Sequence, residues 1–164
     1  MYWRIYKMKG NDKVIAALNQ SLHEELTALS QYFVHSEMCE SWKYDKLAKS
    51  TKKLSIMEMK HAEKLIERIL FLDGSPTVTG PTHLKIGKNV KEQIASDLEL
   101  ELGAVKLYNA AIKLSRDEND NATAEFFAKL LKDEEDHADW LESQLHLMEE
   151  IGYERYLAKQ VGKD

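Results

Sequence analysis

Apolar side chains recur at steps of three and four residues along four long segments of the chain. In the first segment they are Ile15, Leu18, Leu22, Leu29 and Tyr32. This spacing places side chains on one face of an α-helix and is typical of the inward face of a helix bundle. It predicts a first helix that begins at Lys13, is capped by Asn11 or Asp12, and runs to about Met38 or Trp42.

Three further segments carry the same period. The inward positions are Leu47, Thr51, Leu54, Leu65 and Leu72 in the second, Ile94, Leu98, Val105, Tyr108 and Ile112 in the third, and Phe127, Leu130, Leu141, Gln144 and Met148 in the fourth. Because only the short stretch 39–44 precedes the second helix, we expect that helix to return antiparallel beside the first. The third helix should end near Arg116 and the fourth near Gly152. Residues 153–161 are predicted to form a short fifth helix that is stable only if it packs on something.

The connection between the second and third helices is unusual. The second helix should stop at residues 73–76 (Asp-Gly-Ser-Pro), because Gly74 can supply a left-handed cap and Pro76 cannot continue a helix. Residues 74–89 then form a connection that is long for a compact domain, in which Val78-Thr79 could add a short extended piece. If the second helix pair repeats the first, a crossover of this kind is needed to join the pairs. The predicted fold is therefore all-α: a four-helix bundle with a long crossover between helices 2 and 3 and a short C-terminal fifth helix.

Composition agrees with this picture and narrows the function. A chain of 164 residues with 43% hydrophobic residues and only two prolines suits one helical domain, which we assign to residues 11–164, with residues 1–10 as an N-terminal extension. The single cysteine, Cys39, excludes an intrachain disulfide framework and fits a reducing compartment. Without a long apolar run or a secretory signal, we expect a cytoplasmic protein with no membrane partner. A net charge of −5 argues against nucleic acid as the main ligand.

The same polar set interrupts the inward stripes twice. In each half of the chain, a Glu is followed 33 residues later by a second Glu, and three residues further on by a His. The six residues are Glu25, Glu58 and His61 in the first half and Glu101, Glu134 and His137 in the second. Residues three apart lie on one face of a helix about one turn apart, so each Glu-x-x-His pair can address a single point.

These six residues are candidate metal ligands and catalytic residues. Buried carboxylates are costly unless they are paired, and the stripes carry no Lys or Arg near this level. Two divalent cations are the simplest counter-charge for four carboxylates, and oxygen and imidazole ligands suit iron or manganese, with zinc as a competitor. A lone Glu-x-x-His would more often be a solvated surface feature, but two copies at one interval favour a site. Tyr32 and Tyr108, seven residues after Glu25 and Glu101, are core aromatics whose hydroxyls could bond to ligand carboxylates.

One Glu from each of two helices and one Glu-x-x-His from each of the other two resembles the di-iron site of ferritin-like proteins. Four stretches resemble bacterioferritin in particular: residues 31–33 (QYF), 57–62 (MEMKHA), 66–72 (IERILFL) and 133–141 (DEEDHADWL). The resemblance covers roughly residues 8–160 in length and helix order. It implies that the six residues are ferroxidase ligands of a di-iron centre, with Glu58 and Glu134 bridging the two irons.

The resemblance also implies what the protein does and what it binds. Such a protein would oxidise Fe(II) with O2 or H2O2, store ferric mineral inside a hollow homo-oligomer of twenty-four subunits built of dimers, and receive electrons from a ferredoxin. Haem b would be bound at the dimer interface by Met59 of each subunit. Met59 lies about 100° around the helix from Glu58 and begins a second apolar stripe with Ala62, Ile66 and Leu70. Interface packing by an adaptable side chain is the alternative reading of Met59.

One departure from the family pattern concerns an additional iron site. Some relatives carry a His and an Asp before the second-helix motif, whereas this chain has Lys53 and Met57, so we do not expect that site here. Three other functions compete with iron storage. A rubrerythrin-like peroxidase commonly carries an appended iron domain with paired cysteines, which the single cysteine of this chain excludes. A mini-ferritin builds its sites between subunits and needs no repeated set of ligands in one chain. The third is a haem-carrying or structural shell protein.

Overall fold

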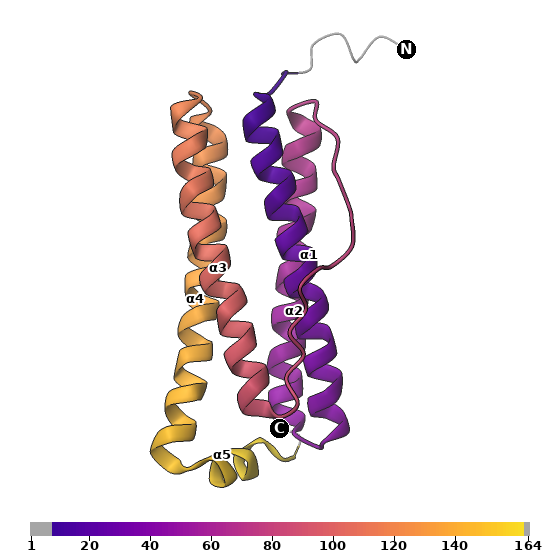
Figure 1. Ribbon diagram of the computed structural model, residues 1–164, viewed down its shortest axis with the longest axis vertical. Coiled ribbons are helices and arrows are strands. Elements are labelled where there is room, and N and C mark those ends of the chain that lie inside the picture. The colour runs from indigo at the N-terminus through magenta and orange to yellow at the C-terminus, as the bar shows by residue number, and fades with distance from the viewer. Residues whose placement is uncertain (1–7, 163–164) are drawn as a thin grey trace.

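The computed structural model describes residues 8–162 of the chain. Within that range it contains five helices and no strand: α1 (Asp12–Ser41), α2 (Asp45–Phe71), α3 (Val90–Asp117), α4 (Asn121–Ile151) and α5 (Tyr153–Gln160). The four long helices lie side by side as a bundle, and α5 crosses its lower end (Figure 1). Helix α1 packs mainly on α2, and α3 mainly on α4. The predicted all-α bundle of two helix pairs with a short fifth helix is confirmed.

Capping side chains define where the helices begin. The side-chain oxygens of Asn11, Asn89 and Asp120 accept hydrogen bonds from backbone N–H groups in the first turns of α1, α3 and α4. At the end of α2 the prediction for Gly74 was wrong, because the left-handed residue is Asp73, with φ of 60°. Gly74 is needed for packing instead: a Cβ there would lie 2.8 Å from Cγ2 of Ile15 on α1. None of the described helices is long and apolar enough to cross a membrane.

The crossover runs from the end of α2 along the α1–α2 pair to the start of α3 (Figure 1). It contains no strand at Val78-Thr79, and its last part is held by side chains of α1. The backbone N–H of Lys85 donates to Oε1 of Gln31 at 2.9 Å, and that of Gly87 donates to Nε2 of His35 at 3.1 Å. A Cβ on Gly87 would overlap the backbone of Gln93, so this close approach to α3 requires glycine.

These crossover contacts belong to a buried polar network that the sequence did not reveal. Nδ1 of His35 donates to the Asp97 carboxylate, at 2.9 Å from Oδ1, and Nε2 of Gln31 donates to the same oxygen at 2.8 Å. Because His35 accepts at Nε2 and donates at Nδ1, both ring nitrogens have partners. The network ties α1, α3 and the crossover together.

Two apolar clusters occupy opposite ends of the bundle. One joins the start of α1, the end of α2 and the facing parts of α3 and α4, and includes Leu18, Leu65 and Phe127. The other joins the end of α1, the start of α2 and α3, the later part of α4 and α5, and includes Leu47, Leu141 and Tyr156. The level between them is where the repeated polar residues lie. The predicted extension at residues 1–10 falls mainly outside the described residues, although Gly10 donates its backbone N–H to the carbonyl oxygen of Leu72 at 2.8 Å.

Candidate metal centre

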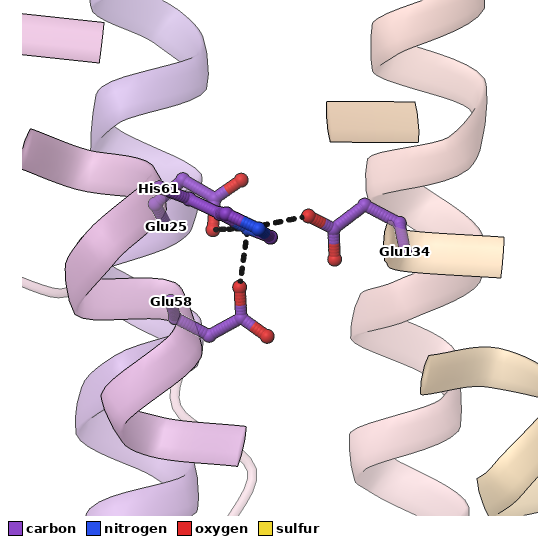
Figure 2. Close-up of side chains that lie close together, drawn as sticks. All are labelled: Glu25, Glu58, His61 and Glu134. Carbon is purple, nitrogen blue, oxygen red and sulfur yellow. Dashed lines mark ion pairs between the residues drawn. The ribbon is translucent and has the colours of Figure 1, made fainter. Parts of the chain in front are cut away.

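All six repeated polar residues point into the middle of the bundle. Each is at most 3% exposed, and each of the four long helices contributes at least one of them. They are Glu25 from α1, Glu58 and His61 from α2, Glu101 from α3, and Glu134 and His137 from α4. In Figure 2, Glu134 approaches the imidazole of His61 from the side opposite Glu25 and Glu58. The structure thus brings together every residue that the sequence repeat singled out.

The first half of the centre is built around Nδ1 of His61. This nitrogen lies 2.9 Å from Oε1 of Glu134, 3.0 Å from Oε2 of Glu58 and 3.5 Å from Oε2 of Glu25 (Figure 2). Glu58 is three residues before His61 on the same helix, so the helical repeat supplies this contact directly. The other two carboxylates reach it from neighbouring helices.

The second half repeats this geometry around Nδ1 of His137. That nitrogen lies 2.9 Å from Oε1 of Glu58, 3.4 Å from Oε2 of Glu134 and 3.7 Å from Oε1 of Glu101. The two imidazole rings stack with their centroids 6.0 Å apart and their planes 17° apart. The repeat in sequence has become an approximate twofold repeat in space.

The donor atoms form two overlapping groups of four. One group takes an atom each from Glu25, Glu58, His61 and Glu134, the other from Glu58, Glu101, Glu134 and His137, and within each group the atoms lie within 4.8 Å of one another. Both oxygens of Glu58, Oε1 of Glu134 and both Nδ1 atoms are buried and lack a well-formed hydrogen bond among the described residues. Such unsatisfied groups are costly in a core, and cations would satisfy them. The donor set therefore fits two metal ions, with Glu58 and Glu134 in reach of both.

The carboxylates fall into two classes by pKa. Burial raises the pKa of Glu25 and of Glu101 well above the usual range, and the neighbouring carboxylates of Glu58 and Glu134 add to this. For Glu58 and Glu134, burial also acts to raise the pKa, but their contacts with the two imidazoles outweigh it. The pKa of Glu58 is lowered, and that of Glu134 is lowered to about 2.

The imidazoles show the opposite balance. Burial acts to lower the pKa of each histidine, but three carboxylates around each ring outweigh it, so the pKa of His61 is strongly raised and that of His137 is raised to about 12. Without a metal, the two imidazolium ions are thus the positive charges that the core requires. Metal ions would take over that role, because a histidine ligand must be deprotonated.

Tyrosine hydroxyls support Glu25 and Glu101, the two outer glutamates, each of which belongs to only one of the two donor groups. Tyr32 donates to Oε1 of Glu101, and Tyr108 donates to Oε1 of Glu25, so each tyrosine serves the glutamate of the other half. The expected bonds from these tyrosines to candidate ligand carboxylates are thus present. Asp133, whose role sequence reasoning missed, lies 3.1 Å from Nε2 of His61 through its Oδ2. Its signal was only its place one residue before Glu134.

Met59 lies outside the bundle core, as expected. Its side chain is 44% exposed, and Ile56 and Leu70 on the same helix are also exposed. The predicted second apolar stripe is only partly correct, because Ala62 is buried in the core cluster and Ile66 packs against it. Position 62 is four residues after the buried Glu58 and three before the buried Leu65, so it lies on the same inward face of the helix. An accessible thioether on an apolar surface nevertheless fits a haem ligand.

Known proteins resemble the chain over almost its whole length. Residues 15–151 match the model of the ferritin-like domain. A bacterioferritin of Mycolicibacterium paratuberculosis is 42% identical over 95% of this chain and 98% of its own, and one of Streptomyces coelicolor is 42% identical over 92% and 90%. A bacterioferritin of Brucella melitensis is 44% identical over 91% of this chain and 92% of its own. This chain therefore belongs to the ferritin-like proteins and, among them, to the bacterioferritin family.

Proposed function

We propose that this protein stores iron and that its buried centre is a ferroxidase site, which oxidises Fe(II) to Fe(III). Membership of the bacterioferritin family supports the storage role. The observation that carries the ferroxidase assignment is the pair of overlapping donor groups with two shared carboxylates. Two Fe(II) ions held there as substrate would each give up one electron, so an oxidant could take two electrons in one encounter.

Each part of the centre has a distinct task in this proposal. The shared carboxylates of Glu58 and Glu134, both with lowered pKa, would stay ionised and hold both ions together. Glu25 and Glu101 would each complete one half, oriented by the tyrosine hydroxyls. Because the ligand set is anionic and buried, it favours the more highly charged ferric state over the ferrous state. All donors come from one chain, in contrast to mini-ferritin sites built between subunits.

The ferroxidase assignment is tested by removing one ligand at a time from the second half. We expect Glu101→Ala and His137→Ala to oxidise Fe(II) far more slowly than the parent, measured by the absorbance of ferric product in stopped flow. Glu142→Ala, an exposed change on α4, is the matched control and should behave as the parent does. Parent-like rates for both ligand variants would refute the assignment. If the shell and haem were intact in that case, a haem-carrying or structural shell protein would be the better description.

The assembly and the haem are separate parts of the proposal. The mass from gel filtration with light scattering should correspond to twenty-four chains, and a dimer would contradict a hollow store. After expression with haem supplied, the visible spectrum should show a haem with two thioether ligands, which Met59→Leu should abolish. Met57→Leu, a change at the half-buried methionine two residues earlier, should leave that spectrum unchanged. The oxidant, O2 or H2O2, and a ferredoxin as electron donor stay predictions from the family resemblance.

A further inference from the structure

The two halves of the centre have identical kinds of ligand. Each has its own glutamate, its own histidine and a share of Glu58 and Glu134. Each outer glutamate accepts a hydrogen bond from one tyrosine hydroxyl. Any difference in how tightly the halves hold a metal must therefore come from contacts beyond these atoms.

Such a difference exists at the far nitrogen of the two imidazoles. Nε2 of His61 lies 3.1 Å from Oδ2 of Asp133, which can only accept, so the proton of the neutral ring is fixed on Nε2. Nδ1, the nitrogen that faces the carboxylates, is then left with its lone pair free for a metal. A carboxylate behind a histidine ligand both orients the ring and makes it a stronger donor.

His137 has no such support. Its Nε2 is buried and has no hydrogen-bond partner among residues 8–162. The two Glu-x-x-His motifs are 76 residues apart, since 134 − 58 = 76, so the position that corresponds to Asp133 is Met57. A thioether is at best a weak acceptor.

The surroundings of His137 offer no substitute carboxylate. His137 and Met57 line a hollow of about 260 Å³, together with Lys53 and Asp136. The Lys53 ammonium group can only donate hydrogen bonds, and Asp136 accepts one from Nζ of Lys132 at 2.8 Å on the exposed face of α4. Within the described residues, Nε2 of His61 therefore has a carboxylate partner and Nε2 of His137 has none.

We infer that the two metal positions have unequal affinity: the His61 position fills first and empties last, and the His137 position holds its ion more weakly. This inference rests on the proposed dinuclear centre and adds an order of filling to it. Loss of an outer-shell partner of a metal ligand typically lowers metal affinity by about 10–100-fold. We therefore expect the His61 position to be favoured by at least about tenfold. One ion would be resident, and the other would be the one that exchanges.

The test uses Co²⁺ as a probe, because it binds without being oxidised under anaerobic conditions. Crystals of the full assembled protein with one Co²⁺ per chain should show anomalous density mainly at the His61 position. Met57→Asp supplies the missing carboxylate, and should bring the two occupancies close to equal. Asp133→Met should remove the preference, and the double exchange should reverse it. Asp139→Met, an exposed change on the same helix, should leave the preference as in the parent.

Each outcome of this experiment decides something. Equal occupancy in the parent, a preference for the His137 position, or a preference that survives Asp133→Met would overturn the inference. Solution titration followed by the Co²⁺ visible absorption gives the same answer for any variant that does not crystallise, through two separate binding steps in the parent. Saturation below two Co²⁺ per chain would instead overturn the dinuclear centre itself, so the two failures can be told apart.

Discussion

Metal uptake by this centre should release about four protons for every pair of divalent ions, a number that follows from the groups with raised pKa. Those groups are Glu25, Glu101 and the two histidines, whose pKa values are all raised in the metal-free centre, so we expect each to carry a proton that a metal ion would displace. Glu58 and Glu134, with lowered pKa, stay ionised. Two imidazolium ions then balance two carboxylates, and the metal-free centre is neutral. Two divalent ions would displace the four protons and leave a neutral centre again.

The sign of the pH dependence follows directly. The metal-free protein binds more protons than the metal-bound protein, so lowering the pH favours the metal-free form. With four protons displaced, the overall association constant for two ions should fall by about four orders of magnitude for each unit by which the pH is lowered. This dependence should hold as long as the pH stays above the lowered pKa of the shared carboxylates and below the raised pKa of the other groups.

Calorimetry in two buffers of different protonation enthalpy measures the proton count. Zn²⁺ is a suitable probe because it has no redox chemistry. We expect about four protons per two Zn²⁺ in the parent, and about three in Glu25→Gln, which has no carboxyl proton to lose at that position. Binding without proton release, or an affinity that does not change with pH, would refute the assignment of protons to the buried groups.

Three further predictions concern the surroundings of the centre. Tyr32→Phe and Tyr108→Phe should each weaken Co²⁺ binding by about tenfold and to a similar extent, because each removes one bond to an outer glutamate; metal titration compares them. His35→Leu should lower the free energy of unfolding by about 1.5–3 kcal/mol, because the buried Asp97 carboxylate loses the hydrogen bond from the imidazole. The double variant with Asp97→Leu should recover part of this loss in denaturant unfolding. Gly87→Ala should lower the melting temperature, with a cost of about 1–3 kcal/mol, because its methyl group would overlap the first turn of α3.

The sequence was sufficient to predict the bundle and the meeting of six polar residues inside it. Helical period and capping residues are local signals, and a polar residue on an apolar stripe is visible without knowledge of the partner helix. The interval of 33 residues within each half then showed that the interruptions form a set. For these reasons Glu25 and Glu101 could be singled out from the spacing of residues alone.

Contacts between distant segments could not be predicted in the same way. His35 lies three residues after Tyr32, and Asp97 four residues before Glu101, so both faced inward, but nothing in the sequence paired them. The support of His61 by Asp133 was hidden for a similar reason, since an Asp beside a ligand usually faces water. The left-handed position at Asp73 was missed because a neighbouring glycine gave the stronger signal, although that glycine is needed for close packing.

The buried carboxylates of this centre must allow the helix bundle to fold before any metal ion is bound. Four ionised carboxylates at one level would oppose folding by several kcal/mol each, even with apolar clusters packed at both ends of the bundle. The raised pKa values of Glu25, Glu101 and the two histidines favour removal of that obstacle, because a proton on each of the four groups would leave the metal-free centre neutral. In the proposed centre the same side chains would serve two states, and the exchange of four protons for two divalent ions would leave the net charge of the core unchanged. The sequence repeat makes this balance possible, since each half brings one group of each kind that the balance needs.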